Sequence, residues 1–122
     1  MILADTSVWV DHFRHGNAQL RQALLDGQIL THPFVIGEIA CGNLHSRSKV
    51  LDDLQRLPSV LFAEHQEVLS FLEQHRLFGK GITWIDAHLL ASVLLSACKL
   101  WTLDSRLSLA ARRLQISHDA GH

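Results

Sequence analysis

Two aspartates each follow a short apolar run that is typical of a buried strand. Asp5 comes directly after residues 1–4, and Asp104 comes directly after residues 100–103. In open parallel α/β sheets, ligands bind just outside the carboxyl ends of the strands, and neighbouring strands lie about 4.8 Å apart. Two carboxylates placed in this way would crowd their charges into one pocket, which is costly unless they are protonated or neutralised by a cation. The pair therefore predicts a metal site.

Two further acids, Glu38 and Asp86, lie in predicted helices. Glu38 is set among apolar residues, where an unpaired buried carboxylate would be costly, so a salt bridge to an arginine is one explanation. Asp86 comes three residues after Thr83 in the first turn of a long helix, so a capping role is an equally ordinary explanation. Taken together, four acids at the ends of elements around one sheet edge favour a divalent-metal site.

The ligand type indicates which metal and which chemistry to expect. Carboxylate oxygens suit Mg²⁺ or Mn²⁺, whereas Zn²⁺ prefers histidine and cysteine. Mg²⁺ usually keeps several waters and completes its shell with substrate phosphate. Such a site activates water and neutralises the charge that builds on a phosphodiester. The predicted reaction is phosphodiester hydrolysis.

The elements that must position these acids alternate between strands and helices. Strands are predicted over residues 1–4, 28–32, 59–63 and 100–103, with a short edge strand over 115–118. Helices are predicted over residues 6–14, 20–27, 34–42, 46–57, 65–77, 84–97 and 105–114. The helix over 84–97 is apolar nearly all round, which predicts a central position. This alternation predicts a parallel sheet covered on both faces and joined by right-handed crossovers.

Size and composition indicate a compact globular protein. The chain has 122 residues, of which 48% are hydrophobic and 19% charged, and we expect a single domain over residues 1–122. No apolar run approaches the ~20 residues of a membrane span, and the start lacks the basic residues of a signal peptide. We therefore expect a cytoplasmic protein without a membrane partner.

The cysteines and tryptophans are expected to be structural. Cys41 and Cys98 fit neither a metal knuckle nor a disulfide framework and are predicted to be buried thiols. Trp9, Trp84 and Trp101 each lie inside an apolar run. We therefore expect all three tryptophans in the core.

The net charge of −1 looks unfavourable for a nucleic-acid partner, but the charges can be separated into those of the candidate site and those of the remaining surface. If the four acids form one site, eight of the twelve acids remain elsewhere, against eleven lysines and arginines. Eight of those eleven are arginines, whose planar guanidinium suits bidentate contact with phosphate. A positive surface around an acidic pocket is compatible with nucleic acid, although a small excess of arginine is also ordinary surface decoration.

Four motifs together resemble one known family. They are residues 2–9 (ILADTSVW), 36–39 (IGEI), 85–91 (IDAHLLA) and 102–107 (TLDSRL). In this order and at this spacing they resemble the PIN-domain nucleases and, within them, the VapC-like toxins of bacterial toxin–antitoxin pairs. The resemblance covers essentially the whole chain. It implies a three-layer α/β/α fold with a central five-stranded parallel sheet in the order 3-2-1-4-5.

The same resemblance implies an activity and its partners. It implies an endoribonuclease that depends on Mg²⁺ or Mn²⁺, is inhibited by a cognate antitoxin and forms a homodimer. The implied catalytic residues and metal ligands are Asp5, Glu38, Asp86 and Asp104. Hydroxyls that orient a carboxylate or a water would come from Thr6, Ser7 and Thr102.

One departure from the family leaves two questions open. Some members carry another acid shortly after the fourth, but here Ser105 and Arg106 follow Asp104, so the number of metal ions is undecided. Arg106 contacts substrate phosphate under one interpretation and is a solvated surface residue under the other. The leucine-rich segments over 20–25 and 44–57 form either a groove for an antitoxin helix or simply part of the core.

Three rival functions remain at this stage. The nine histidines would suit a metal-independent ribonuclease, but they are scattered over different predicted elements, and most are expected at the surface. A phosphotransferase with an aspartyl nucleophile would typically carry a second Asp where this chain has Ser7. A catalytically silent binding module would keep the fold and an acidic pocket, although all four acids are present.

Overall fold

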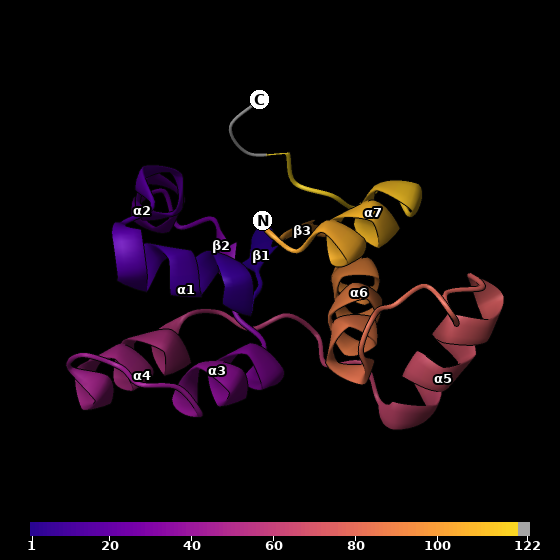
Figure 1. Ribbon diagram of the computed structural model, residues 1–122, viewed down its shortest axis with the longest axis horizontal. Helices are drawn as coiled ribbons and strands as arrows, with labels where there is room; N and C mark the ends of the chain where they lie inside the picture. Colours follow the sequence, from indigo (N-terminus) through magenta and orange to yellow (C-terminus); the bar gives the residue numbers. More distant parts are fainter. Residues whose placement is uncertain (120–122) are drawn as a thin grey trace.

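The computed structural model describes residues 1–119 as an alternating series of strands and helices (Figure 1). The strands are β1 (Ile2–Ala4), β2 (Ile29–Leu30) and β3 (Lys99–Trp101). The helices are α1 (Thr6–His15), α2 (Ala18–Leu25), α3 (Pro33–Ala40), α4 (Arg47–Arg56), α5 (His65–Gln74), α6 (Trp84–Ser96) and α7 (Ser105–Arg113). Every predicted helix is present, with ends that differ by a few residues. No helix of the described chain has the length and apolar character that crossing a bilayer requires.

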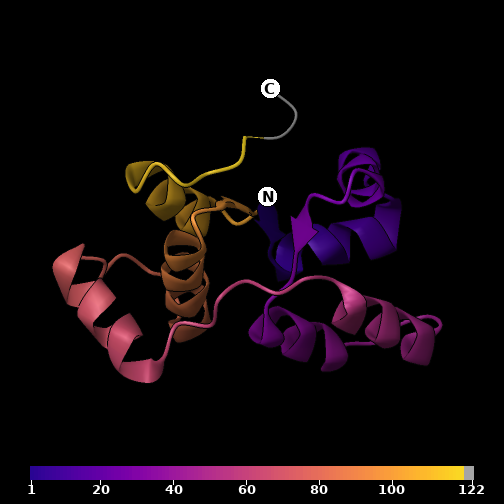
Figure 2. The ribbon, with the colours of Figure 1, turned by 180° about the vertical axis from the view of Figure 1, so that it is seen from behind.

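The elements form three layers, with a parallel sheet between two layers of helices. The sheet has the order β2-β1-β3, with Leu3 paired to Leu30 on one side and to Leu100 on the other. Figures 1 and 2 show α1 to α4 on one side of the strands and α5 to α7 on the other. With helices on both faces, the strands are buried on both faces and read as continuous apolar runs. The predicted α/β architecture with a parallel sheet is confirmed.

The prediction of five strands is wrong, because the sheet has three strands within residues 1–119. The two expected outer strands are reduced to single parallel bridges, Thr31 with Ser59 and Leu100 with Ser117. After the first bridge, the backbone N–H groups of residues 61 and 63 donate to the hydroxyls of Ser96 and Ser92 on α6. These N–H groups are therefore not available to pair with β2, and the pairing is limited to the single bridge between Thr31 and Ser59.

The core lies on both faces of the sheet and includes buried residues from both helical layers. All seven residues 87–93 of α6 are buried, which confirms that this helix is central. In the sheet, Leu3 and Leu100 are fully buried side by side. Burying each such side chain contributes about 1.5–3 kcal/mol to stability. The strands that end at the candidate site are thus held rigidly in the centre of the molecule.

Four side chains differ in burial from what the sequence indicates. Trp84 is 38% exposed because it is the first residue of α6, whereas Trp9 and Trp101 are in the core as predicted. Cys41 is exposed at the end of α3, while Cys98 is buried as predicted. Two histidines, at positions 32 and 88, are buried rather than at the surface.

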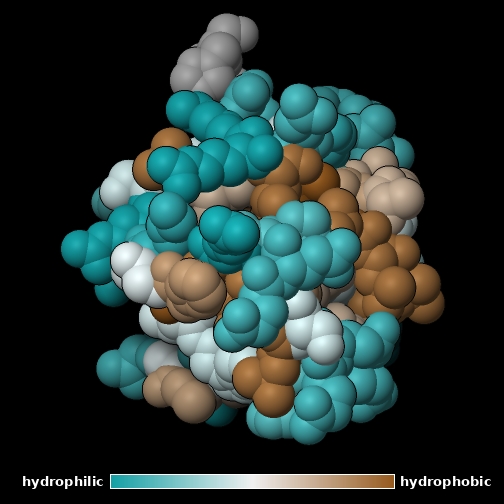
Figure 3. All heavy atoms as spheres, turned by 90° about the vertical axis from the view of Figure 1, so that its right-hand side faces the viewer, coloured by the Kyte–Doolittle hydropathy of each residue, from teal (hydrophilic) through white to brown (hydrophobic). Residues whose placement is uncertain are grey.

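The outer face of the α5–α7 layer is partly apolar. Leu94 and Leu95 on α6, Leu69 on α5 and Leu109 on α7 are all at least 40% exposed. Figure 3 looks onto this side and shows apolar atoms gathered over part of it, bordered by hydrophilic residues. A groove of about 580 Å³ runs between α5 and α6 and is lined in part by Leu94 and Leu95.

Candidate active site

Asp5 is buried at the carboxyl end of the central strand. Its backbone N–H donates to the carbonyl of Trp101 at 3.0 Å, which continues the pairing of β1 with β3 by one residue. Its Oδ1 accepts hydrogen bonds from the Ser7 hydroxyl at 2.5 Å and from the Val8 N–H at 3.2 Å. Its Oδ2 accepts from the Thr102 hydroxyl at 2.5 Å. The carboxylate is thereby fixed in orientation by two strands and the first turn of α1.

The electrostatic state of Asp5 follows from this position. Burial raises the pKa of the Asp5 carboxyl above its ordinary value, and the hydroxyls of Ser7 and Thr102 and nearby backbone N–H groups only partly offset that effect. Within the described chain, neither Asp5 nor any of the other three acids forms an ion pair with a lysine or an arginine. A bound cation would supply the positive charge that the protein itself does not.

Asp104 is connected to Asp5 through Thr102 and Ser7. The Asp104 N–H donates to the Thr102 hydroxyl at 3.0 Å, and the N–H of Leu103 donates to the Ser7 hydroxyl at 2.9 Å. Oδ1 of Asp104 accepts from the backbone N–H groups of residues 106 and 107, at 2.9 and 3.0 Å, and so caps α7. Asp5, which directly follows β1, and Asp104, the N-cap of α7, therefore belong to one hydrogen-bonded network.

Glu38 approaches this network through the residue next to Asp5. The hydroxyl of Thr6 donates to Oε1 of Glu38 at 2.8 Å and joins α1 to α3. Glu38 is exposed, so the expectation that its carboxylate is buried is wrong. The salt bridge to an arginine that would have given Glu38 an ordinary role is not found among residues 1–119.

Asp86 has the cap role that the sequence indicates. Its Oδ2 accepts from the N–H of Thr83 at 3.0 Å, and its own N–H donates to the Thr83 hydroxyl at 3.1 Å. This is the predicted capping box, and it is confirmed. Because α6 ends just before β3 begins, its first turn lies towards the carboxyl ends of the strands. No hydrogen bond among the described residues joins Asp86 to Asp5, Glu38 or Asp104.

The four acids form a set of oxygen donors rather than a ready-made cage. Among residues 1–119, no three Asp, Glu, His or Cys side chains lie close enough together to hold a metal ion by themselves. Mg²⁺ is usually held by one or two carboxylates, with waters and substrate phosphate completing its shell. A buried carboxylate without a basic partner and with neighbouring acids at the same edge fits that kind of binding.

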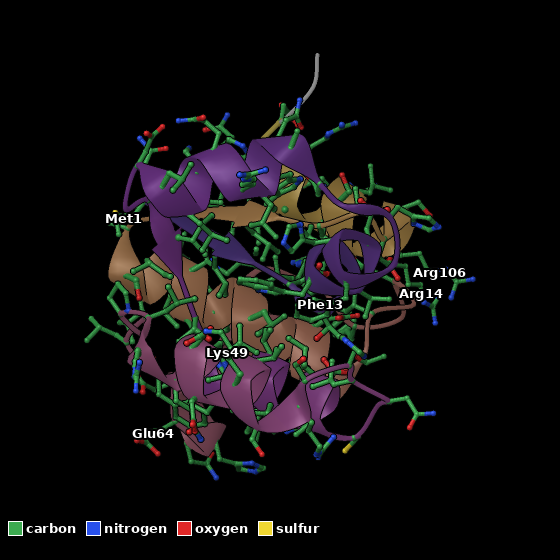
Figure 4. All side chains as sticks on the ribbon, turned by 90° about the vertical axis from the view of Figure 1, so that its left-hand side faces the viewer. Met1, Phe13, Arg14, Lys49, Glu64 and Arg106 are labelled. Atoms are coloured by element: carbon green, nitrogen blue, oxygen red, sulfur yellow. The ribbon has the colours of Figure 1, made fainter. Side chains whose placement is uncertain are left out.

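Sequence reasoning missed the residues around the acids. A hollow of about 130 Å³ beside Glu38 is lined by Val10, Phe13, Arg14, Glu38, Ile39, Gly42, Asn43 and Leu44. In Figure 4, the side chains of Arg14 and Arg106 project from the same side of the molecule. Arg14 lies in the last turn of α1, after its apolar stretch. That position is the only feature of the sequence that could have indicated a basic side chain near Glu38.

Sequence comparison assigns the chain to a family. The model of the PIN domain family matches residues 2–113, so the chain belongs to that family. It is also 44% identical over 111 residues to Ribonuclease VapC32 of Mycobacterium tuberculosis strains CDC 1551 / Oshkosh and ATCC 25618 / H37Rv, a match that covers 90% of each chain. The resemblance to VapC-like PIN-domain nucleases is thus confirmed.

Proposed function

We propose that this chain is an endoribonuclease that requires Mg²⁺ or Mn²⁺ and acts as the toxin of a toxin–antitoxin pair. The observation that supports this most directly is the buried Asp5 carboxylate, which is held by Ser7 and Thr102 and has no basic partner in the described chain. Membership of the PIN family and a relative named as a ribonuclease also support a ribonuclease activity.

The proposed metal ligands are Asp5 and Asp86, with Asp104 and Glu38 completing the site. When bound, the cation would lower the pKa of a water and neutralise charge on the phosphate in the transition state. The protein's own part is to hold Asp5 in one orientation and to keep basic side chains away from its carboxylate. Ser105 and Arg106 follow Asp104, so the donor set lacks the further acid that some family members carry, and the number of cations stays open.

Glu38 and Asp104 are the candidates for accepting a proton from the attacking water. Glu38 is exposed and accepts only from Thr6 among the described residues, so it is free to receive a proton from water. Asp104 has an oxygen that is not used in capping α7 and is the second candidate for this role. Attack by water on phosphorus, in line with the leaving oxygen, gives 5′-phosphate and 3′-hydroxyl ends.

The activity is tested by incubating the purified chain with labelled RNA and Mn²⁺ or Mg²⁺, with EDTA as control. We expect cleavage that stops with EDTA and is abolished in Asp5→Asn, whose circular dichroism and cooperative unfolding should match those of the wild type. Mapping the ends of the products checks the nucleophile, because attack by the ribose 2′-OH would leave a cyclic phosphate instead. Cleavage by Asp5→Asn at the wild-type rate, or undiminished activity in EDTA, would refute the proposal. Affinity for RNA without any product under Mn²⁺ would favour a silent binding module.

The antitoxin is proposed to bind in a groove between α1, α2 and α4. A hollow of about 230 Å³ there is lined by Trp9, His12, Phe13, Leu24, Val50, Asp53, Leu54 and Leu57. Phe13 also lines the hollow next to Glu38, so the apolar groove leads towards the acids. An amphipathic helix with apolar residues at helical spacing would fit such a groove. Loss of antitoxin binding in Phe13→Asp, with RNA cleavage retained, is the expected result.

The homodimer and the cytoplasmic location stay predictions. The partly apolar face of α5 to α7 is the surface that a second copy would cover (Figure 3). Light scattering on the purified chain distinguishes a dimer from the 13.7 kDa monomer. In a dimer of this kind, Leu95→Asp should produce monomers.

A further inference from the structure

Arg106 lies against the backbone of a glycine in the loop between α5 and α6. A Cβ atom added to Gly81 would lie 2.9 Å from Nη1, 3.0 Å from Cδ and 3.2 Å from Nε of Arg106. The first distance is shorter than real Cβ contacts and the other two are tight, so a side chain at position 81 would push Arg106 away from this placement. The contact joins the start of α7 to the loop that leads into α6.

The position of Arg106 is suited to an anion. It is the second residue of α7, two positions after Asp104, and its own N–H binds that carboxylate. Its guanidinium forms no ion pair with any acid of the described chain and projects outwards in Figure 4. Arginine presents its donors in a fixed fork that matches two phosphate oxygens, provided that its stem is held in place.

We propose that Gly81 is a positioning residue that seats Arg106 for contact with a phosphate of the RNA backbone next to the site of cleavage. This inference rests on the proposed ribonuclease function. Gly81 lies three residues before α6 begins, and Arg106 lies in the first turn of α7.

Gly79, in the same loop, provides a matched control. Its φ of +70° is close to the +79° of Gly81, so an alanine at either position incurs the same kind of backbone strain. No atom lies within 4 Å of a Cβ added at Gly79, whereas one added at Gly81 meets Arg106. Because the atoms it meets belong to a flexible side chain, Gly81→Ala should displace the arginine rather than unfold the protein.

The test measures RNA binding and cleavage for the same set of variants. Binding of a short fluorescent single-stranded RNA is followed against salt in the Asp5→Asn background, where product does not form. We expect Arg106→Gln and Gly81→Ala each to weaken binding about tenfold at low salt, as the loss of one charge-assisted contact would. The slope of log affinity against log salt should fall by about 0.7, the value for one phosphate on a single strand. Gly79→Ala should bind like its parent.

A double-mutant comparison distinguishes the positioning of Arg106 by Gly81 from a general effect of the substitution on the loop. In the Arg106→Gln background, Gly81→Ala should cause no further loss, because the side chain that it displaces is already gone. In the cleavage assay with Asp5 intact, both single variants should raise KM more than they lower kcat. If alanine prevents folding, Gly81→Asn and Gly79→Asn replace the pair, since asparagine tolerates positive φ better and still carries a Cβ.

Three results would overturn the inference. These are an Arg106→Gln variant with wild-type affinity and salt slope, equal effects of Gly81→Ala and Gly79→Ala, or additive losses in the double variant. Each of these leaves the proposed nuclease standing if the wild type still cleaves RNA. A wild type that binds RNA but never cleaves it contradicts the proposed function, while the binding comparison still decides the role of Gly81.

Discussion

Acidification should destabilise this protein through His32, which caps the helix that carries Glu38. The ring is fully buried. Its Nδ1 accepts from the N–H of Phe34 at 3.0 Å, and its Nε2 lies 3.2 Å from the hydroxyl of Ser92. Since Nδ1 accepts a hydrogen bond, the proton of the neutral ring is on Nε2 and is donated to Ser92. A second proton on Nδ1 would point at the N–H that it caps and would break the start of α3.

The size and sign of the effect follow from the pKa of His32. Burial, and next the charge of His88, lower this pKa from 6.5 to about 4. The unfolded chain therefore takes up the proton first, and stability is complete above pH 6.5 and is lost as the pH falls towards 4. The whole loss is about 3 kcal/mol, of which about 2.5 kcal/mol should be gone at pH 4.5. Burial also lowers the pKa of His88, which acts in the same direction, and raises that of Asp5, which opposes the loss.

Urea unfolding between pH 7.5 and pH 4.5 isolates the contribution of His32. His32→Asn keeps an oxygen acceptor at the start of α3 but has no group that titrates in this range. The free energy of unfolding of the wild type should fall more steeply than that of this variant, by about 2.5 kcal/mol over the range. His45→Asn, which replaces an exposed histidine, should follow the wild type. Parallel curves for the wild type and His32→Asn would refute the reasoning.

Three further perturbations test the site and the core. Millimolar Mg²⁺ should raise the melting temperature of the wild type but not of Asp5→Asn, and an unmoved wild type would contradict a metal site that includes this carboxylate. Thr102→Val removes a hydroxyl that binds Asp5 and accepts from the N–H of residue 104, so kcat should fall and stability should drop by about 1–3 kcal/mol, measured by cleavage and urea unfolding. Leu100→Ala in the central sheet should cost about 2–5 kcal/mol, against under ~0.5 kcal/mol for the exposed Leu109→Ala.

The sequence was sufficient for features that depend on neighbouring residues. The capping box of Thr83 and Asp86 is a pattern over three residues, and it forms as predicted. Asp5 directly follows the apolar strand β1, as predicted, whereas β3 ends at Trp101, so that Asp104 lies three residues beyond the strand, at the N-cap of α7. The alternation of helices with short apolar runs was likewise enough to predict a parallel sheet.

Features that depend on distant residues could not be predicted in this way. The expected strand over 59–63 is lost because its donors bind two serines about thirty residues later, on α6. The burial of His32 requires Ser92 and the aromatic rings of Phe34 and Phe62 around it, which come together only in the folded chain. The contact of Gly81 with Arg106 is of the same kind, since the sequence shows only a glycine in a loop.

The capping and metal-binding interpretations of the acids are compatible, because a cap uses only one carboxylate oxygen. Asp104 caps α7 with Oδ1, and Asp86 closes its capping box with Oδ2; in the described chain, no hydrogen bond engages the other oxygen of either residue. Each acid can therefore start a helix and still offer an oxygen to a cation. Helix N-termini also carry partial positive charge, which reduces the repulsion among the acids before a cation binds.

Substitution of Asp104 separates the two roles. Serine is as good an N-cap as aspartate but offers no carboxylate, so Asp104→Ser should keep the melting temperature close to that of the wild type and lose RNA cleavage. Asp104→Ala removes the cap as well and should cost a further ~1 kcal/mol of stability, measured by urea unfolding. If Asp104→Ser cleaves RNA at the wild-type rate, Asp104 serves only to start α7, and the catalytic set is reduced to Asp5, Glu38 and Asp86.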